Sequence, residues 1–219
     1  MSVKLVALSK PSADTDCRTA EELIAYAARV SNPANQSNKD TAPKLLGYLM
    51  RENHWSPFEM VHMTMEIVTS RDIARQILRH RSFAFQEFSQ RYAVSENIDV
   101  IREPRLQDLK NRQNSNITDD RVITEEWFRS QQRIRNAAKK EYQAALKMGI
   151  AKEQARALLP EGLTETTLYM AGSLRSWIHY CDLRRANGTQ KEHMEVAQQC
   201  WDIIEGHFPS ITKARKSIE

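Results

Sequence analysis

The most chemically distinctive part of this sequence is a stretch in which every basic side chain except one histidine is an arginine. Residues 71–91 contain no lysine, and their basic residues are Arg71, Arg75, Arg79, His80, Arg81 and Arg91. A guanidinium grips a phosphate or a carboxylate through two parallel hydrogen bonds, which a lysine ammonium cannot do. The only acidic residues in the stretch are Asp72 and Glu87. We therefore expect a bound anion here, and the alternative is a charged surface paired with distant carboxylates.

A second group of arginines without lysines follows in the C-terminal half. Between Ala155 and Gln190 the arginines are Arg156, Arg175, Arg184 and Arg185. Helical spacing places Arg175 and His179 one turn apart, with Arg184 about one turn further along. We therefore expect part of this helix to face a polar site. His179 by itself is equally well explained as a partly buried structural histidine.

Several common catalytic motifs are absent. The chain has 6 glycines and contains neither GxGxxG nor GxxxxGK(S/T), so phosphate groups must be held by side chains. Its 6 histidines include no HExxH pair, and no metal site is expected. A GxSxG motif is also absent, and no cysteine lies within residues 71–91. The spacing therefore does not indicate covalent catalysis.

The elements that must position these residues are mostly helices. Apolar residues at helical spacing predict helices, and alternating apolar residues predict strands. On this basis the expected helices are 19–30, 42–52, 72–80, 125–148, 152–158, 173–185 and 190–207, the expected strands are 3–8, 62–68 and 163–170, and residues 106–120 form a polar loop. We predict an α+β fold with a helix-rich single domain over residues 1–219 around a small antiparallel or mixed sheet, and not a Rossmann fold.

Composition limits the class of protein. The chain has 219 residues, of which 41% are hydrophobic, and a net charge of +4, which suffices for one domain with a real core. No apolar run is long enough to cross a bilayer, and no signal peptide is recognisable at the N-terminus. Its three cysteines form no CxxC pair. We therefore expect a cytoplasmic protein with reduced thiols and no contact with a membrane.

The arginine-rich stretch also carries a longer motif. Arg79-His80-Arg81 is followed after seven residues by Ser89 and then by Gln90-Arg91-Tyr92. This pattern resembles that of the flavin-dependent thymidylate synthases. Further matches to that family occur in the expected order, at AARVS (27–31), HWSPFE (54–59), RQ (75–76), RALLP (156–160) and GSLRSW (172–177). The resemblance therefore spans nearly the whole chain.

The resemblance implies an enzyme, an FAD-dependent methyltransferase that converts dUMP to dTMP. It implies 5,10-methylenetetrahydrofolate as the carbon donor and NADPH-reduced FAD as the source of hydride, with no cysteine nucleophile. It also implies a homotetramer in which FAD lies at subunit interfaces and each site is shared between subunits. Neither nucleic acid nor a membrane is an expected partner.

The family's functional residues carry over to named positions. The residues expected to bind the cofactor are Ser56, Glu59, Arg79, His80, Arg81, Glu87, Arg175 and His179. Those expected to bind the substrates are His54, Gln76, Arg79, Glu87, Ser89, Gln90, Arg91, Arg156 and Arg184. Of these, His54 is expected beside the flavin face that folate or nicotinamide approaches. Arg184 is the expected catalytic residue, because a fixed cation stabilises negative charge that develops on the uracil.

Two other functions agree with parts of the sequence. A basic helical protein could bind nucleic acid through residues 71–91, but these basic residues do not form a long stripe with spaced aromatic residues. A helical interaction module could use the charged helix expected at residues 125–148. Bound flavin separates the enzyme from both alternatives.

Overall fold

The fold is built on a four-stranded antiparallel sheet. The computed structural model describes residues 1–216. The strand order is β1-β2-β6-β3, and the strands are β1 (Ser2–Leu8), β2 (His62–Ser70), β6 (Glu165–Ser173) and β3 (Ala84–Glu87). Every neighbouring pair is antiparallel. This sheet, with helices around it, confirms the predicted α+β class. That the chain is one domain stays a prediction, and residues 217–219 lie outside the described part.

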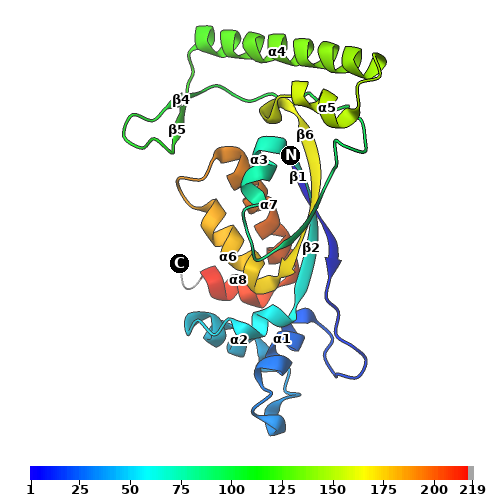
Figure 1. Ribbon diagram of the computed structural model, residues 1–219. Coiled ribbons are helices and arrows are strands. Elements are labelled where there is room, and N and C mark those ends of the chain that lie inside the picture. Colours follow the sequence, from blue (N-terminus) through cyan, green and yellow to red (C-terminus); the bar gives the residue numbers. More distant parts are fainter. Residues whose placement is uncertain (217–219) are drawn as a thin grey trace.

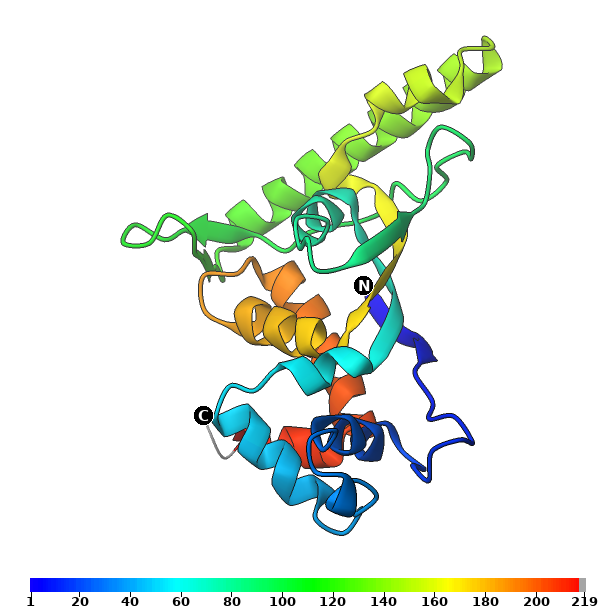
Figure 2. The same cartoon turned by 60° about the horizontal axis from the view of Figure 1, so that its bottom comes forward.

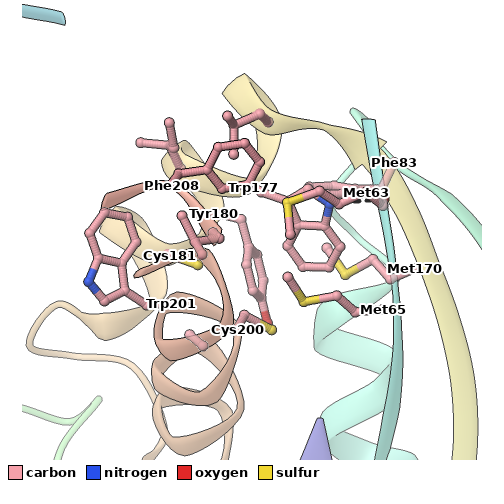
Figure 3. Close-up of a cluster of buried hydrophobic side chains, with 14 of the residues drawn as sticks. Met63, Met65, Phe83, Met170, Trp177, Tyr180, Cys181, Cys200, Trp201 and Phe208 are labelled. Atoms are coloured by element: carbon pink, nitrogen blue, oxygen red, sulfur yellow. Dashed lines mark hydrogen bonds between the residues drawn. The ribbon is translucent and has the colours of Figure 1, made fainter. Parts of the chain in front are cut away.

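The alternation in β2 determines which face of the sheet is buried. Met63, Met65 and Ile67 are buried, whereas Thr64 and Glu66 are only partly covered. Successive side chains of a strand point to opposite faces, so the apolar set lies on one face. Helices α6 (Leu174–Arg185) and α7 (Lys191–His207) cover that face (Figure 1). Figure 3 shows aromatic and sulfur-containing side chains of these helices packed against the strand methionines.

The remaining helices lie at the two ends of the sheet. Helices α1 (Ala20–Ala28), α2 (Ala42–Arg51) and α8 (Pro209–Lys216) pack together at one end. At the other end lie α4 (Arg121–Lys147) and α5 (Lys152–Ala155), and α3 (Arg71–Ile77) follows β2 directly. Figure 2 shows α4, in green, far from α1 and α2, in blue. Short 3-10 helices are η1 (Pro33–Asn35), η2 (Ser56–Met60), η3 (Arg156–Leu158) and η4 (Glu161–Leu163).

Three details differ from the sequence-based expectations. The segment expected as a loop contains a hairpin of β4 (Arg105–Gln107) and β5 (Ser115–Ile117). Its turn is stabilised by the Asp108 carboxylate, which accepts hydrogen bonds from the backbone N–H groups of Lys110 and Asn111. Strand β3 and helix α8 were not predicted, because each is short and β3 depends on pairing with the distant β6.

The third difference concerns the arginine-rich stretch itself. Helix α3 ends at Ile77, so Arg79, His80 and Arg81 lie in the turn that follows it. The expectation that the helix continues to His80 is therefore wrong. Because α3 ends early, Arg75 and Arg79 do not share a helical face.

No helix within residues 1–216 is both long enough and apolar enough to cross a membrane.

Candidate active site

Arg184 and His80 form the central pair of predicted site residues. Arg184 is in the last turn of α6, and its Nε donates a hydrogen bond to His80 Nε2 at 2.9 Å. Burial, and then the nearby charge of Arg184, lower the pKa of His80 to about 4. His80 is therefore neutral at pH 7, with its proton on Nδ1, because Nε2 must accept from a guanidinium that can only donate. Each side chain fixes the orientation of the other.

Gln76 lies beside this pair on α3, in contact with two polar residues from outside the helix. Its Oε1 is 3.2 Å from His193 Nδ1, and its Nε2 donates to Gln190 Oε1 at 2.8 Å. His193 Nε2 is in turn 3.1 Å from the Tyr180 hydroxyl. Burial lowers the pKa of His193 to about 3, with smaller effects from Arg184 and His80.

His193 and Gln190 are absent from the residues predicted to form the site. His193 is fully buried. On α7 it lies one turn before Val196 and Ala197 and two turns before Cys200, which are also buried. A histidine on the apolar face of a predicted helix is the one signal in the sequence that could have indicated a buried polar partner.

A second group of predicted residues lies at the start of α6 and in η2. Arg175 Nη1 donates to Glu59 Oε1 at 2.8 Å. Burial acts to raise the pKa of Glu59, but hydrogen bonds from Ser173 and Arg175 outweigh it and hold this pKa below its usual range. The His179 ring meets the Trp55 ring edge-on, with centroids 4.5 Å apart. Ser56, predicted to bind the cofactor, and His54, predicted to bind a substrate, are exposed in the same segment. The structure therefore places these predicted residues near one another, and their roles stay predictions.

Glu87 on β3 is surrounded by two arginines. Its carboxylate lies 3.3 Å from Arg71 Nη1 and 3.5 Å from Arg75 Nη1, and it accepts a hydrogen bond from the Thr166 hydroxyl at 3.0 Å. Arg75 also pairs with Glu161, at 3.1 Å. Arg71 and Arg75 are therefore paired with carboxylates of the chain itself, which agrees for these two arginines with the alternative of an internally paired charged surface. The bound anion stays a prediction. The second carboxylate comes from η4, and sequence spacing gave no indication of it.

Four other arginines keep an unbalanced charge. Within residues 1–216, no acidic side chain forms an ion pair with Arg79, Arg81, Arg156 or Arg184. Arg79 and Arg81 are exposed, and Arg156 and Arg184 are partly buried. An exposed guanidinium without a carboxylate partner suits a phosphate or pyrophosphate. The donors present therefore fit a dinucleotide cofactor that no glycine-rich loop holds.

The last segment of the motif, Ser89 to Arg91, has mainly local contacts. Arg91 pairs with Glu153 at 3.4 Å on the surface, and the Ser89 hydroxyl accepts from the Arg91 backbone N–H. Gln90 is buried, and its amide donates to the Ser95 hydroxyl. The proposed roles of these three residues stay predictions.

A large cavity lies away from these residues. It has a volume of about 770 Å³ and lies between the β4–β5 hairpin, α4 and residues 187–194. None of the predicted site residues lines it, whereas Gln190, which contacts Gln76, does. The predicted site residues therefore lie outside this cavity.

Fold and site together define a class of protein: an α+β protein with arginine side chains suited to anionic ligands. A family model described as "Thymidylate synthase complementing protein" matches residues 15–210, and the chain belongs to this family, the flavin-dependent thymidylate synthases. The "Probable flavin-dependent thymidylate synthase" of Paramecium bursaria Chlorella virus 1 is 52% identical over 214 residues, which cover 98% of each chain. The "Flavin-dependent thymidylate synthase" of Synechocystis sp. is 49% identical over 217 residues, which cover 98% of this chain and 99% of that one.

A solved structure agrees with the sequence relatives. The UMP/dUMP methylase PolB from Streptomyces cacaoi, bound with 5-Br dUMP, matches with a TM-score of 0.78 at 29% identity and covers 99% of this chain and 94% of that one. These matches confirm the predicted family and the predicted class of enzyme, a flavin-dependent thymidylate synthase. The residue roles were not tested by them and stay predictions.

Proposed function

We propose that this chain methylates dUMP to dTMP with 5,10-methylenetetrahydrofolate as the carbon donor and NADPH as the reductant of its flavin, FAD. The observation that carries the proposal concerns the arginines of the two lysine-free segments. Four of them, Arg79, Arg81, Arg156 and Arg184, have no carboxylate partner in residues 1–216. A pyrophosphate and a nucleotide phosphate supply the missing negative charge. FAD, when bound, supplies the hydride for the reaction, and the protein binds and orients the reactants.

The proposed FAD ligands are Ser56, Glu59, Arg79, His80, Arg81, Glu87, Arg175 and His179. Within this set, the ion pair between Arg175 and Glu59 holds the guanidinium in one direction. The His179 ring is held against Trp55. Both contacts already restrict these side chains, so the side chains lose less conformational entropy when a ligand binds. They support a preformed cofactor surface at η2 and the start of α6.

The proposed substrate ligands are His54, Gln76, Arg79, Glu87, Ser89, Gln90, Arg91, Arg156 and Arg184, with dUMP held by all except His54, which faces folate or NADPH. Arg184 is the proposed catalytic residue. Its Nε donates a hydrogen bond to His80, and its two Nη groups have no acceptor within residues 1–216. They are free to stabilise negative charge on the uracil, and a cation that is already oriented costs no reorganisation when that charge develops.

The site is proposed to be shared between subunits of a homotetramer. Arg156 lies in η3, next to α4 and α5, and Arg184 lies at the end of α6. Along α4, Val122, Trp127 and Ile134 are exposed, and apolar side chains of this kind support an interface with another subunit. A cytoplasmic location and the absence of nucleic acid as a partner stay predictions.

Tritium release from dUMP labelled at C5 tests the proposed reaction. Purified protein given FAD, NADPH and methylenetetrahydrofolate is expected to release tritium and form dTMP, and to be yellow when flavin is bound. The reaction without folate is the control for dTMP formation. Colourless protein that releases no tritium and binds nucleic acid with a steep salt dependence would instead support the alternative function.

A further inference from the structure

A chain of side-chain hydrogen bonds passes through Gln76. It connects Tyr180, His193, Gln76, Gln190 and Glu192 in that order, and Arg102 and Arg105 hold its last member. The chain crosses from α6 through α7 and α3 to Gln190, the N-cap of α7, and ends at Glu192 in the first turn of α7. It begins beside His80, whose ring centroid is 4.9 Å from that of Tyr180. Its opposite end borders the cavity of about 770 Å³, which Gln190, Arg102 and Arg105 line.

Glu192 sets the direction of these hydrogen bonds. Arg102 Nη1 lies 3.0 Å from its carboxylate, and Arg105 donates to the other oxygen. These contacts keep Glu192 ionised, and an ionised carboxylate only accepts hydrogen bonds. Gln190 must therefore turn its NH₂ group toward Glu192, at 2.9 Å, and its oxygen toward Gln76.

The same reasoning fixes the next two side chains. Because Gln190 presents an oxygen, Gln76 must donate to it from Nε2 and use Oε1 to face His193. His193 must then carry its proton on Nδ1, and its Nε2 accepts from the Tyr180 hydroxyl. A Gln76 amide rotated by half a turn would place two acceptors together at Gln190 and two donors together at His193. In a buried site such mismatched groups are costly.

We propose that His193 and Gln190 are positioning residues that hold the Gln76 amide in a single orientation toward the bound nucleotide. The inference rests on the proposed function, in which Gln76 contacts dUMP. One N–H of Gln76 and one lone pair of its Oε1 are not used by the chain of hydrogen bonds. An amide held in one orientation presents this donor and this acceptor to the nucleotide at fixed positions. In an amide that is free to rotate, the donor and the acceptor exchange positions.

Four variants separate positioning from general stability. His193→Leu fills the buried space but removes the donor to Gln76, and His193→Asn keeps an N–H close to the position of Nδ1. Gln190→Leu removes the second partner from a loop, where it disturbs folding least. Ile204→Ala is the matched control, because Ile204 is buried in the same helix and has no polar contact with Gln76.

The expected readout is the equilibrium dissociation constant of dUMP, measured by calorimetry on the flavin-loaded enzyme. His193→Leu and Gln190→Leu each weaken dUMP binding about tenfold, the effect of one lost or mismatched hydrogen bond. His193→Asn stays within about threefold of wild type, and Ile204→Ala lowers the melting temperature but leaves dUMP affinity unchanged. In a Gln76→Ala background, His193→Leu has no further effect on affinity, because it acts through Gln76.

Nitrogen NMR tests the orientation without any substrate. The His193 ring is expected to show a protonated Nδ1 and an unprotonated Nε2 at neutral pH, and the Gln76 amide signals are expected to broaden in the Gln190→Leu variant. A proton on Nε2 overturns the inference, as do affinity losses that multiply in the double variant. If wild-type protein does not bind dUMP, the proposed function fails, and the NMR result alone decides whether the amide is fixed.

Discussion

The hydrogen bond between Arg184 and His80 orients the guanidinium without neutralising it. A neutral imidazole accepts from Arg184 Nε without cancelling the charge of the guanidinium. A carboxylate at that place would hold the arginine equally well but would neutralise it. The lowered pKa of His80, caused first by burial, keeps the imidazole neutral over the physiological range.

Replacing Arg184 tests the role of its charge. Arg184→Ala is expected to lower kcat by about 10²- to 10³-fold, the usual effect of removing a group that stabilises developing charge. The dissociation constant of dUMP should change much less, because the charge develops only during the reaction. Rapid-quench kinetics and calorimetry measure the two quantities, with the exposed Arg129→Ala on α4 as the control. Equal losses in both would reassign Arg184 to binding alone.

The buried His193 predicts how stability depends on pH. Its pKa falls from 6.5 in the unfolded chain to about 3 in the folded protein, so between these values the unfolded state binds the additional proton. Its contribution is therefore complete above pH 6.5 and decreases as the pH falls toward 3. We expect the free energy of unfolding to drop by about 2 kcal/mol between about pH 6.5 and pH 4.5 from this residue. Urea denaturation at several pH values measures the loss, and a His193→Asn variant with an unchanged slope would contradict the assignment.

Two junctions between a strand and a helix position the site at the scale of elements. Strand β2 continues directly into α3, and β6 continues directly into α6. The two strands are antiparallel, so the junctions lie at opposite ends of the pair, where Ser70 pairs with Glu165 and His62 pairs with Ser173. Helix α6 then runs back along the sheet for about 18 Å, given 1.5 Å per residue. This return places Arg184 beside His80.

A glycine keeps β6 and the segment before β3 close together. A Cβ atom on Gly172 would lie 2.5 Å from Phe83 Cδ1, and Phe83 is itself packed on Trp177, with ring centroids 4.8 Å apart. Gly172→Ala should therefore destabilise the protein by about 1–3 kcal/mol, as overpacking of a core does. Thermal unfolding measures it, and adding Phe83→Leu should recover part of the loss. Gly206→Ala is the control, because no atom lies within 4 Å of its added Cβ.

At the scale of the whole molecule, the unbalanced arginines belong to an open surface. With a net charge of +4, the chain pairs Arg71 and Arg75 internally but leaves Arg79, Arg81 and Arg156 without acidic partners in residues 1–216. Anionic ligands enclosed between subunits would both neutralise these groups and exclude water from them. In a symmetric oligomer, such a ligand is contacted by different residues of each subunit.

Mixing two inactive variants tests whether the site is shared. If Arg156 and Arg184 reach one nucleotide from different subunits, mixed oligomers of Arg156→Ala and Arg184→Ala contain some sites with neither substitution. Equal mixing should restore about one quarter of the wild-type activity. Native mass spectrometry is needed to verify that mixed oligomers form. If they form and the activity stays at the level of the separate variants, both arginines act from one chain.

The sequence by itself determined most of the long helices and strands, and the family. The alternation of Met63, Met65 and Ile67 specified β2, since side-chain direction in a strand depends only on position along the chain. The motif from Arg79 to Tyr92 specified the family, because the types and spacing of its residues can be read from one continuous segment without knowledge of the fold. The helices were predicted for the same local reason, apart from α8 and the early end of α3 at Ile77.

Only the tertiary structure decided which of these residues meet. Arg75 forms an ion pair with Glu161, 86 positions away in the sequence. Arg184 donates a hydrogen bond to His80, 104 positions away. The short strand β3 exists because β6 offers it a partner, and His193 contacts Gln76 because α7 packs against α3. Local propensity cannot encode such contacts, since they depend on how the helices and the sheet pack as a whole.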